Sequence, residues 1–284
     1  MGVDAVAVAE RALAWLSLYQ AVGAALFVAL FLRGVPTLCE RVRRIGGLAA
    51  CIGGVLLLAQ LPLMAARMAG DSSGLTNANL LHLALHSSQA RSCGGMLLGL
   101  VLLAIGLLMR GARVSIWFGI GLATISPTLT GHTSVHAHRA LLAPLLSAHV
   151  LIGAFWLGSL WPLLLTVRFE RPTDAVAVLQ KFSRMAGWLV PCLALAGLGM
   201  AFLLIGDWSV LRRPYGELLL GKLGVFALLL ALAAVNRWRF TPMMSLAPAA
   251  ARRALQRSII TEYLLIAAVL GMTATLTTLF GPED

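Results

Sequence analysis

The stretch LAWLSLYQAVGAALFVALFL, residues 13–32, contains no charged side chain in twenty consecutive positions. A helix needs roughly 20 apolar residues to cross the hydrocarbon core of a bilayer. Similar runs recur along the chain, which is 60% hydrophobic and only 12% charged, with a mean hydropathy of +0.89. Soluble domains carry about 25% charged residues. The sequence therefore predicts an integral membrane protein.

The apolar runs lack the period-two alternation of membrane β-strands, so they indicate helices. We expect an all-α integral membrane protein with a single polytopic domain over residues 1–284. Asp4 and Glu10 stand where a signal peptide would be basic, so the first run is expected to remain as a span. The predicted bundle has about eight transmembrane helices, at about 9–32, 44–66, 79–109, 113–130, 143–167, 183–206, 216–236 and 256–280.

The basic residues are distributed unequally between the two sets of loops. Of 22 Lys and Arg residues, fifteen fall in the first, third, fifth and seventh loops, six fall on the opposite side, and Lys222 lies inside a span. Cytoplasmic loops carry the excess of Lys and Arg, so both termini are predicted on the periplasmic side. The net charge of +11 then orients the chain in the lipid bilayer, and no nucleic-acid partner is expected.

All six histidines fall on the predicted outer side. On a continuous helix, His82 and His86 would head a stripe that continues inward through Gln89, Cys93 and Met96. Imidazole, thiolate and thioether are copper ligands, and Cys and Met favour the cuprous ion. The candidate copper ligands are therefore His82, His86, His132, His136, His138, His149, Met64, Met68, Cys93 and Met96.

Each of these residues also has an ordinary structural interpretation. A methionine or cysteine in a span commonly packs, and a histidine at a helix end is commonly solvated. His136 and His138 fit an exposed capture site and a polar loop equally well. Gly153 and Gly158, near His149, are expected to let another helix approach closely.

Two charged residues lie inside predicted spans. Lys222 is expected to reach the interface or to pair with Glu217. Glu262 is expected to form a structural ion pair with Arg237 or Arg239, and a proton-coupling role is the alternative.

Three segments resemble one family of bacterial membrane proteins. They are LSAHVLIGAFWLGSLWPLLL (146–165), KFSRMAGWLVPCLALAGLGMAFLLIG (181–206) and RRPYGELLLGKLGVFALLLALAAVNRWRFTP (212–242). They resemble the CopD family of copper-resistance proteins, most strongly over about 144–280. The resemblance implies a multi-pass protein of the bacterial inner membrane that moves copper from periplasm to cytoplasm, with a periplasmic CopC-type copper-binding protein as a partner. It also marks His149, Lys222 and Asn236 as family-typical positions.

Copper transport, with import the expected direction and no enzymatic activity, is the function that these observations predict. One alternative is an electron-transfer protein in which a pair such as His86 and His149 binds b-type haem. Another is a scaffold that delivers copper without transporting it. The chain has no phosphate-binding loop for ATP, so transport is expected to be passive or driven by an ion gradient.

Overall fold

The computed structural model describes residues 2–32, 36–109, 112–205, 212–246 and 248–280, and every regular element within these ranges is helical. The long helices are α1 (Val3–Phe31), α2 (Pro36–Ala69), α4 (Ser88–Leu108), α7 (Arg139–Phe169), α8 (Pro172–Leu204), α9 (Pro214–Val235) and α11 (Pro248–Leu279). The shorter elements are η1 (Ser72–Leu75), α3 (Ala78–Leu85), α5 (Arg113–Ile125), η2 (Ser126–Leu129), α6 (His132–Val135), the π-helical η4 (Asn236–Phe240) and α10 (Thr241–Leu246).

Seven of the described helices are long and apolar enough to cross a membrane. Their outer faces carry large exposed apolar side chains, as lipid requires, including Val55, Leu98, Trp188, Phe202 and Leu228. The all-helical prediction is confirmed. These helices indicate a multi-pass membrane protein.

The fourth expected span, 113–130, is shorter than its neighbours. Its α-helical part, α5, has 13 residues, which rise about 20 Å. The four residues of η2 add about 8 Å. Together they approach the roughly 30 Å of a hydrocarbon core, so a count of eight spans stays a prediction.

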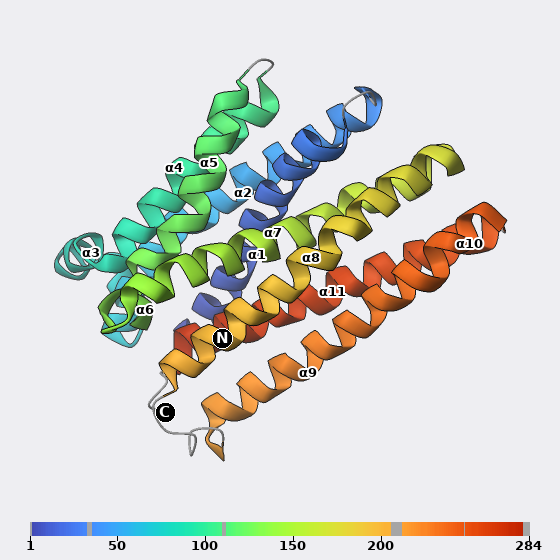
Figure 1. Ribbon diagram of the computed structural model, residues 1–284. Coiled ribbons are helices and arrows are strands. Elements are labelled where there is room, and N and C mark those ends of the chain that lie inside the picture. Colours follow the sequence, from blue (N-terminus) through green and yellow to red (C-terminus); the bar gives the residue numbers. More distant parts are fainter. Residues whose placement is uncertain (1, 33–35, 110–111, 206–211, 247, 281–284) are drawn as a thin grey trace.

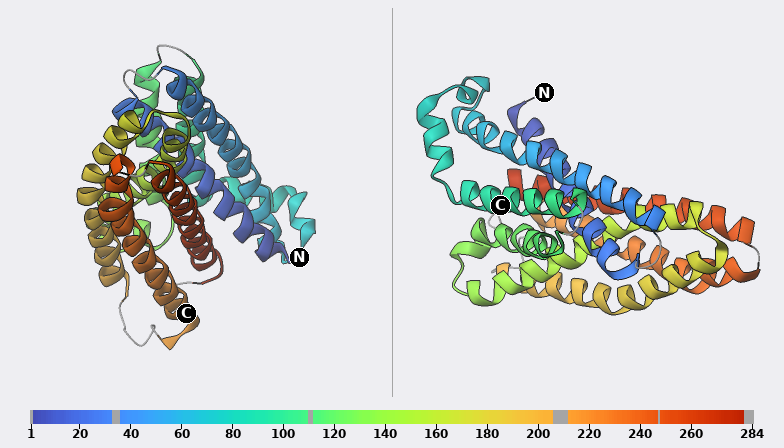
Figure 2. Two further views of the ribbon diagram at one scale, coloured as in Figure 1. Left: turned by 90° about the vertical axis from the view of Figure 1, so that its right-hand side faces the viewer. Right: turned by 90° about the horizontal axis from the view of Figure 1, so that it is seen from above.

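Helix α1 lies inside the bundle and packs against α2, α7 and α11 (Figure 1). On one side of it α2, α4 and α5 pack together, and on the other α8 packs on α7 while α9 packs on α11 (Figure 2). The last half of α1 is buried because it faces neighbours all round, and it supplies Val22, Phe27 and Phe31 to the core.

Two glycines allow α1 and α7 to cross almost backbone to backbone. A Cβ atom on Gly23 would lie 2.2 Å from the carbonyl oxygen of Ala154, and one on Gly158 would lie 2.4 Å from that of Tyr19. Gln20 Nε2 donates to the Gly158 carbonyl over 3.1 Å beside this crossing. The expected close approach at Gly158 is confirmed, while Gly153 instead faces the ring of Tyr19.

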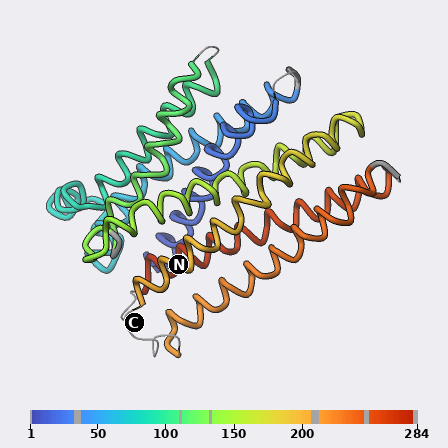
Figure 3. Tube along the Cα trace, in the orientation of Figure 1, coloured from blue at the N-terminus to red at the C-terminus, as the bar shows by residue number. Residues whose placement is uncertain are grey.

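The two ends of the bundle differ in what they carry. The start of α1 and the last turn of α11 lie at the end where α3 and α6 lie, as Figure 3 shows. The start of the first helix and the end of the last described helix therefore share an end of the bundle with the histidine-bearing elements. Which end faces the periplasm stays a prediction.

Candidate metal site

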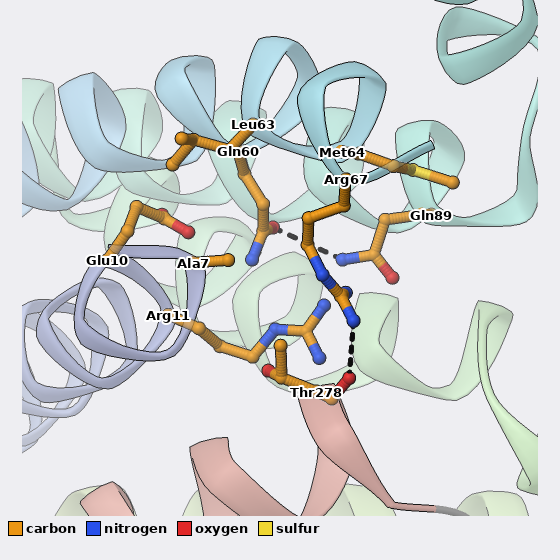
Figure 4. A pocket seen from close by; sticks show the side chains of 9 residues that line it. All are labelled: Ala7, Glu10, Arg11, Gln60, Leu63, Met64, Arg67, Gln89 and Thr278. Atoms are coloured by element: carbon orange, nitrogen blue, oxygen red, sulfur yellow. Dashed lines mark hydrogen bonds between the residues drawn. The ribbon is translucent and has the colours of Figure 1, made fainter. Parts of the chain in front are cut away.

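A pocket of about 170 Å³ opens at the histidine-bearing end of the bundle, between α1, α2, α4 and α11. Polar side chains dominate its wall, and one thioether joins them (Figure 4). The lining residues are Ala7, Glu10, Arg11, Gln60, Leu63, Met64, Arg67, Gln89 and Thr278.

Two arginines tie α1 and α2 to the last turn of α11. Arg11 donates to the Thr277 carbonyl over 2.8 Å, and Arg67 donates to the Thr278 carbonyl over 2.7 Å. Arg67 also pairs with Asp4 at 2.8 Å. The last carbonyls of a helix lack intrahelical partners and carry the negative end of its dipole. Both guanidinium groups are therefore already hydrogen-bonded to the end of α11, and these bonds hold α1, α2 and α11 together around the pocket.

A thiol and two amides form a network behind the wall. The Cys93 thiol donates to Gln60 Oε1 over 2.8 Å, and Gln89 Nε2 donates to the same oxygen over 3.2 Å. Gln89 Nε2 also lies 3.9 Å from Cys93 Sγ. Both glutamines line the pocket, so the buried thiol is one hydrogen bond away from it.

Two buried oxygen atoms of the wall, Glu10 Oε1 and Thr278 Oγ1, have no hydrogen-bond partner among the described residues. Glu10 is only 7% exposed, and its Oε1 forms no hydrogen bond with any described residue. The same holds for Oγ1 of Thr278. A buried polar atom without a partner costs about 1–3 kcal/mol, so both oxygens favour a polar or charged solute in the pocket.

Met64 completes a mixed set of donors. Its sulfur lies 3.9 Å from Oγ of Ser87, the residue that caps α4 by accepting from the amide of Ala90. Thioether, thiol, carboxylate and amide oxygen thus gather at one end of the bundle. The two sulfur donors suit a soft cation, and copper in its cuprous state is the common example.

The predicted continuous helix over 79–109 is wrong at one point. Helix α3 ends at Leu85, and α4 begins at Ser88 after the Ser87 cap. The cap satisfies the free amides of a new helix, so the chain changes direction there. The predicted stripe is split between two helices.

On α4, the two halves of the remaining stripe have different surroundings. Gln89 and Cys93 reach the pocket network, whereas Met96 is buried in the hydrophobic core. Met68, expected to act with Met64, is exposed on α2 outside the pocket lining.

His82 on α3 and His86, the C-cap residue of that helix, form an exposed pair. Their ring centroids lie 4.2 Å apart, and His86 Nδ1 lies 2.9 Å from the His82 carbonyl. Because a carbonyl only accepts, Nδ1 carries the hydrogen and Nε2 of the neutral ring keeps its lone pair. His86 also directly precedes Ser87, which contacts Met64, so the pair stands beside the pocket.

His136 and His138, whose side chains the structure describes, are not part of the pocket wall. The rings of His136 and His138 are 5.5 Å apart, and His136 Nδ1 accepts from the His138 amide. The His132 side chain lies outside the described residues. Within the described ranges no three His, Cys, Asp or Glu side chains come together as a metal-binding group.

His149 lies half-buried between α7 and α8. Its Nδ1 is 3.2 Å from the Leu193 carbonyl, and its ring faces Gly197. The carbonyl again fixes the hydrogen on Nδ1, as second-shell partners of metal-binding histidines do. Nε2 is the nitrogen left for another ligand.

Sequence reasoning missed Glu10, Gln60 and Thr278 as pocket residues. Each is a polar residue in a long and mostly apolar helix, and positions 10, 60 and 278 are well separated in the sequence. A polar residue inside a span usually faces the bundle interior, and that signal alone pointed to them.

Comparison with known proteins agrees with the resemblance drawn from the sequence. Residues 176–276 match the family model described as "Copper resistance protein D". The chain is 27% identical over 304 residues to copper resistance protein D of Pseudomonas syringae pv. tomato, covering 99% of this chain and 98% of that relative. It is also 27% identical over 298 residues to copper transport protein CutJ of Bacillus subtilis (strain 168).

The second match covers 97% of this chain but 53% of CutJ, so the chain spans about half the length of that relative. No solved structure matches the chain. The similarity to the CopD family is thereby confirmed. The pocket residues lie outside the segment that the family model matches.

Proposed function

We propose that the chain carries copper across the bacterial inner membrane, from periplasm to cytoplasm, and that the pocket between α1, α2, α4 and α11 binds the ion on entry. The observation that carries this proposal is the set of donors at the pocket: Met64 and Glu10 in the wall, and Cys93 behind Gln60. The similarity to proteins named for copper resistance and copper transport supports the same cargo.

The cuprous ion suits this set better than a hard divalent ion. Thioether and thiolate are soft donors, whereas Ca²⁺ and Mg²⁺ prefer shells made entirely of oxygen. Cys93 must lose its proton to become a ligand, and Gln60 Oε1 is the acceptor that its hydrogen now contacts. Binding therefore replaces the thiol–amide hydrogen bond with a bond from sulfur to metal.

The histidine pair provides the first contact for the ion. His82 and His86 are exposed, and the backbone links His86 to Ser87 beside the Met64 sulfur. An ion released by the imidazoles has the thioether as its next donor and the Cys93 network after it. A periplasmic CopC-type protein is the partner we propose as the source of this ion.

Import is the direction we propose, and the excess of basic loops, which predicts the pocket on the periplasmic side, supports it. His149 is the candidate ligand deeper in the bundle. Its Nδ1 donates to the Leu193 carbonyl, so the lone pair of Nε2 is the one that can bind the ion. No observation favours a haem protein, and an optical spectrum of the purified protein lacking a Soret band would exclude one.

Copper uptake by cells that express Met64→Leu tests the proposal. Leucine keeps the volume and apolarity of methionine, so the variant is expected to fold. We expect copper accumulation to fall severalfold at equal protein in the membrane. Met109→Leu is the matched control, since Met109 is exposed at the opposite end of α4. Equal uptake in the wild type, both variants and cells without the protein would reject copper transport.

A further inference from the structure

A second buried acidic residue lies far from the pocket, on α11. Glu262 is 4% exposed within a helix long and apolar enough to cross a membrane. No described residue forms an ion pair with it, so the expected pairing with Arg237 or Arg239 is wrong. Arg237 instead donates to the Ser183 carbonyl, and Arg239 is exposed. A carboxyl inside a membrane without a cation requires another explanation.

The partners of this carboxyl are neutral. Asn236 Nδ2 donates to Glu262 Oε1 over 2.5 Å, and the Trp156 indole is its second hydrogen-bonding neighbour. Oδ1 of Asn236 is also buried but has no partner among the described residues. The amide therefore turns its donor to the carboxyl and keeps an unused acceptor beside it.

Irregular backbone holds Asn236 in this position. Residues Asn236–Phe240 form a π-helical turn, in which the Asn236 carbonyl accepts from both the amide and the hydroxyl of Thr241. Such turns are costly and frequently occur at functional sites. Four residues before Glu262, on the same face of α11, the buried hydroxyl of Ser258 likewise lacks a partner.

This arrangement can satisfy either form of the carboxyl. The carboxylate can accept from Asn236 Nδ2 and from the Trp156 indole. The carboxylic acid has an O–H to donate, and Asn236 Oδ1 is an acceptor that a rotation of the amide brings to it. An arginine partner would stabilise only the ionised form, whereas an amide serves both.

We infer that Glu262 takes up and releases a proton inside the membrane, with Asn236 as the positioning residue. This inference rests on the proposed function in one respect, because proton movement through Glu262 would supply the driving force for copper. The proton comes from water at one side, converts the carboxylate to the acid, and leaves to water at the other side. No other bond changes.

The charged groups on the elements packed against α11 leave the carboxyl without a competing partner. Lys222 on α9 and His149 on α7 are electrostatic neighbours of each other. Tyr19 on α1 contacts Trp15, and Tyr263 on α11 contacts Trp161. The remaining titratable or charged residues on these elements form no ion pair or hydrogen bond with the Glu262 carboxyl among the described residues; they are Asp4, Glu10, Arg11, Arg139, Arg168, Tyr215, Glu217, Arg237, Arg239, Arg252, Arg253 and Arg257.

Infrared spectroscopy of the purified protein tests the proton site without copper. The carbonyl stretch of a protonated carboxyl should disappear as the pH rises, and Glu262→Gln should lose this titrating band. Glu217→Gln, at an exposed glutamate of α9, should keep it. The inference fails if the titrating band is unchanged in Glu262→Gln, or if the wild type has no such band while it remains folded.

Proteoliposomes that contain a pH-sensitive dye test the coupling. Wild-type protein should move protons together with copper and should accumulate copper when a pH gradient is imposed. Glu262→Gln should lose both effects but still equilibrate copper without a gradient, and Glu262→Asp should restore part of them. Copper flux that is equal in wild type and Glu262→Gln, with no proton signal, would reject coupling but leave copper transport standing. Wild-type liposomes that carry no copper would reject the proposed function, and the infrared titration would still decide the proton site.

Discussion

The thiol of Cys93 on α4 lies 2.8 Å from the side-chain oxygen of Gln60 on α2, and this contact joins a soft donor to the wall of a polar pocket. The two residues are 33 positions apart, and each is buried in a helix surrounded by lipid-compatible residues. The relationship therefore gives a direct way to test the pocket as a metal site.

Cys93→Ser should weaken binding of the cuprous ion to the purified protein. A hydroxyl keeps the hydrogen bond to Gln60 but is a hard donor, so the fold should survive while the affinity falls about 10- to 100-fold. Competition with a chromogenic cuprous chelator measures the change. Cys51→Ser, at an exposed thiol of α2, is the control. Equal affinities in all three proteins would place the metal elsewhere.

The double substitution His82→Ala and His86→Ala should abolish tight copper binding at the entrance at neutral pH. Wild-type binding should weaken as the pH falls, because protons compete with copper for its ligands. Binding is therefore present at higher pH and lost as the pH falls. Copper stoichiometry after gel filtration, measured at several pH values, reports both effects. If the double variant still bound copper at full stoichiometry, His82 and His86 would not be copper ligands but only solvated residues at the end of a helix.

Gly23→Ala should destabilise the folded protein, because the new methyl group would lie 2.2 Å from the Ala154 carbonyl oxygen. Relieving that overlap must separate α1 from α7, and overpacking of this kind costs about 1–3 kcal/mol. Thermal unfolding in detergent measures it. Gly121→Ala is the matched control, since a Cβ there meets nothing within 4 Å and alanine favours a helix by up to about 1 kcal/mol. Similar unfolding temperatures for both variants would contradict the tight crossing.

A reporter fused after Asp284 should be active only outside the cytoplasm. The loop charges predict both termini on the periplasmic side, and the structure puts the start of α1 and the last turn of α11 at the end that carries α3 and α6 (Figure 1). A reporter active only in the cytoplasm would invert the bundle and move the pocket to the cytoplasmic face. The experiment thus also decides whether the proposed route is import.

Helices long enough to cross the bilayer can be predicted from composition, whereas sites built between them cannot. The run over 13–32 identified α1 because the bilayer requires continuous apolar residues. The same argument joined α3 to α4, since the polar residues around Ser87 are too few to interrupt a hydropathy average. The Ser87 cap was the local signal of the break.

The pocket could not be read from the sequence because its donors come from separate helices. Met64 and Cys93 were chosen for their chemistry, and both lie at the pocket or directly behind it. Glu10 and Gln60 have no local pattern, and only packing brings them together. Glu262 was found as a charge in a span, but its partner is an amide because the π-helical turn presents Asn236 and turns the arginines outward.

The central position of α1 has a consequence for the order in which the protein is assembled. The hydrogen-bond partner of Gln20 on α1 is Gly158, which is synthesised 138 residues later. The partner of Arg11 is Thr277, which is synthesised 266 residues later. When the ribosome has delivered only α1, these polar groups face lipid or the insertion machinery without their partners, at a cost of several kcal/mol for each group left in hydrocarbon. Helix α1 is thus among the last of the described helices to complete its contacts. In a chain that stops before α11, Arg11 of α1 would lack its hydrogen-bond partner on that helix.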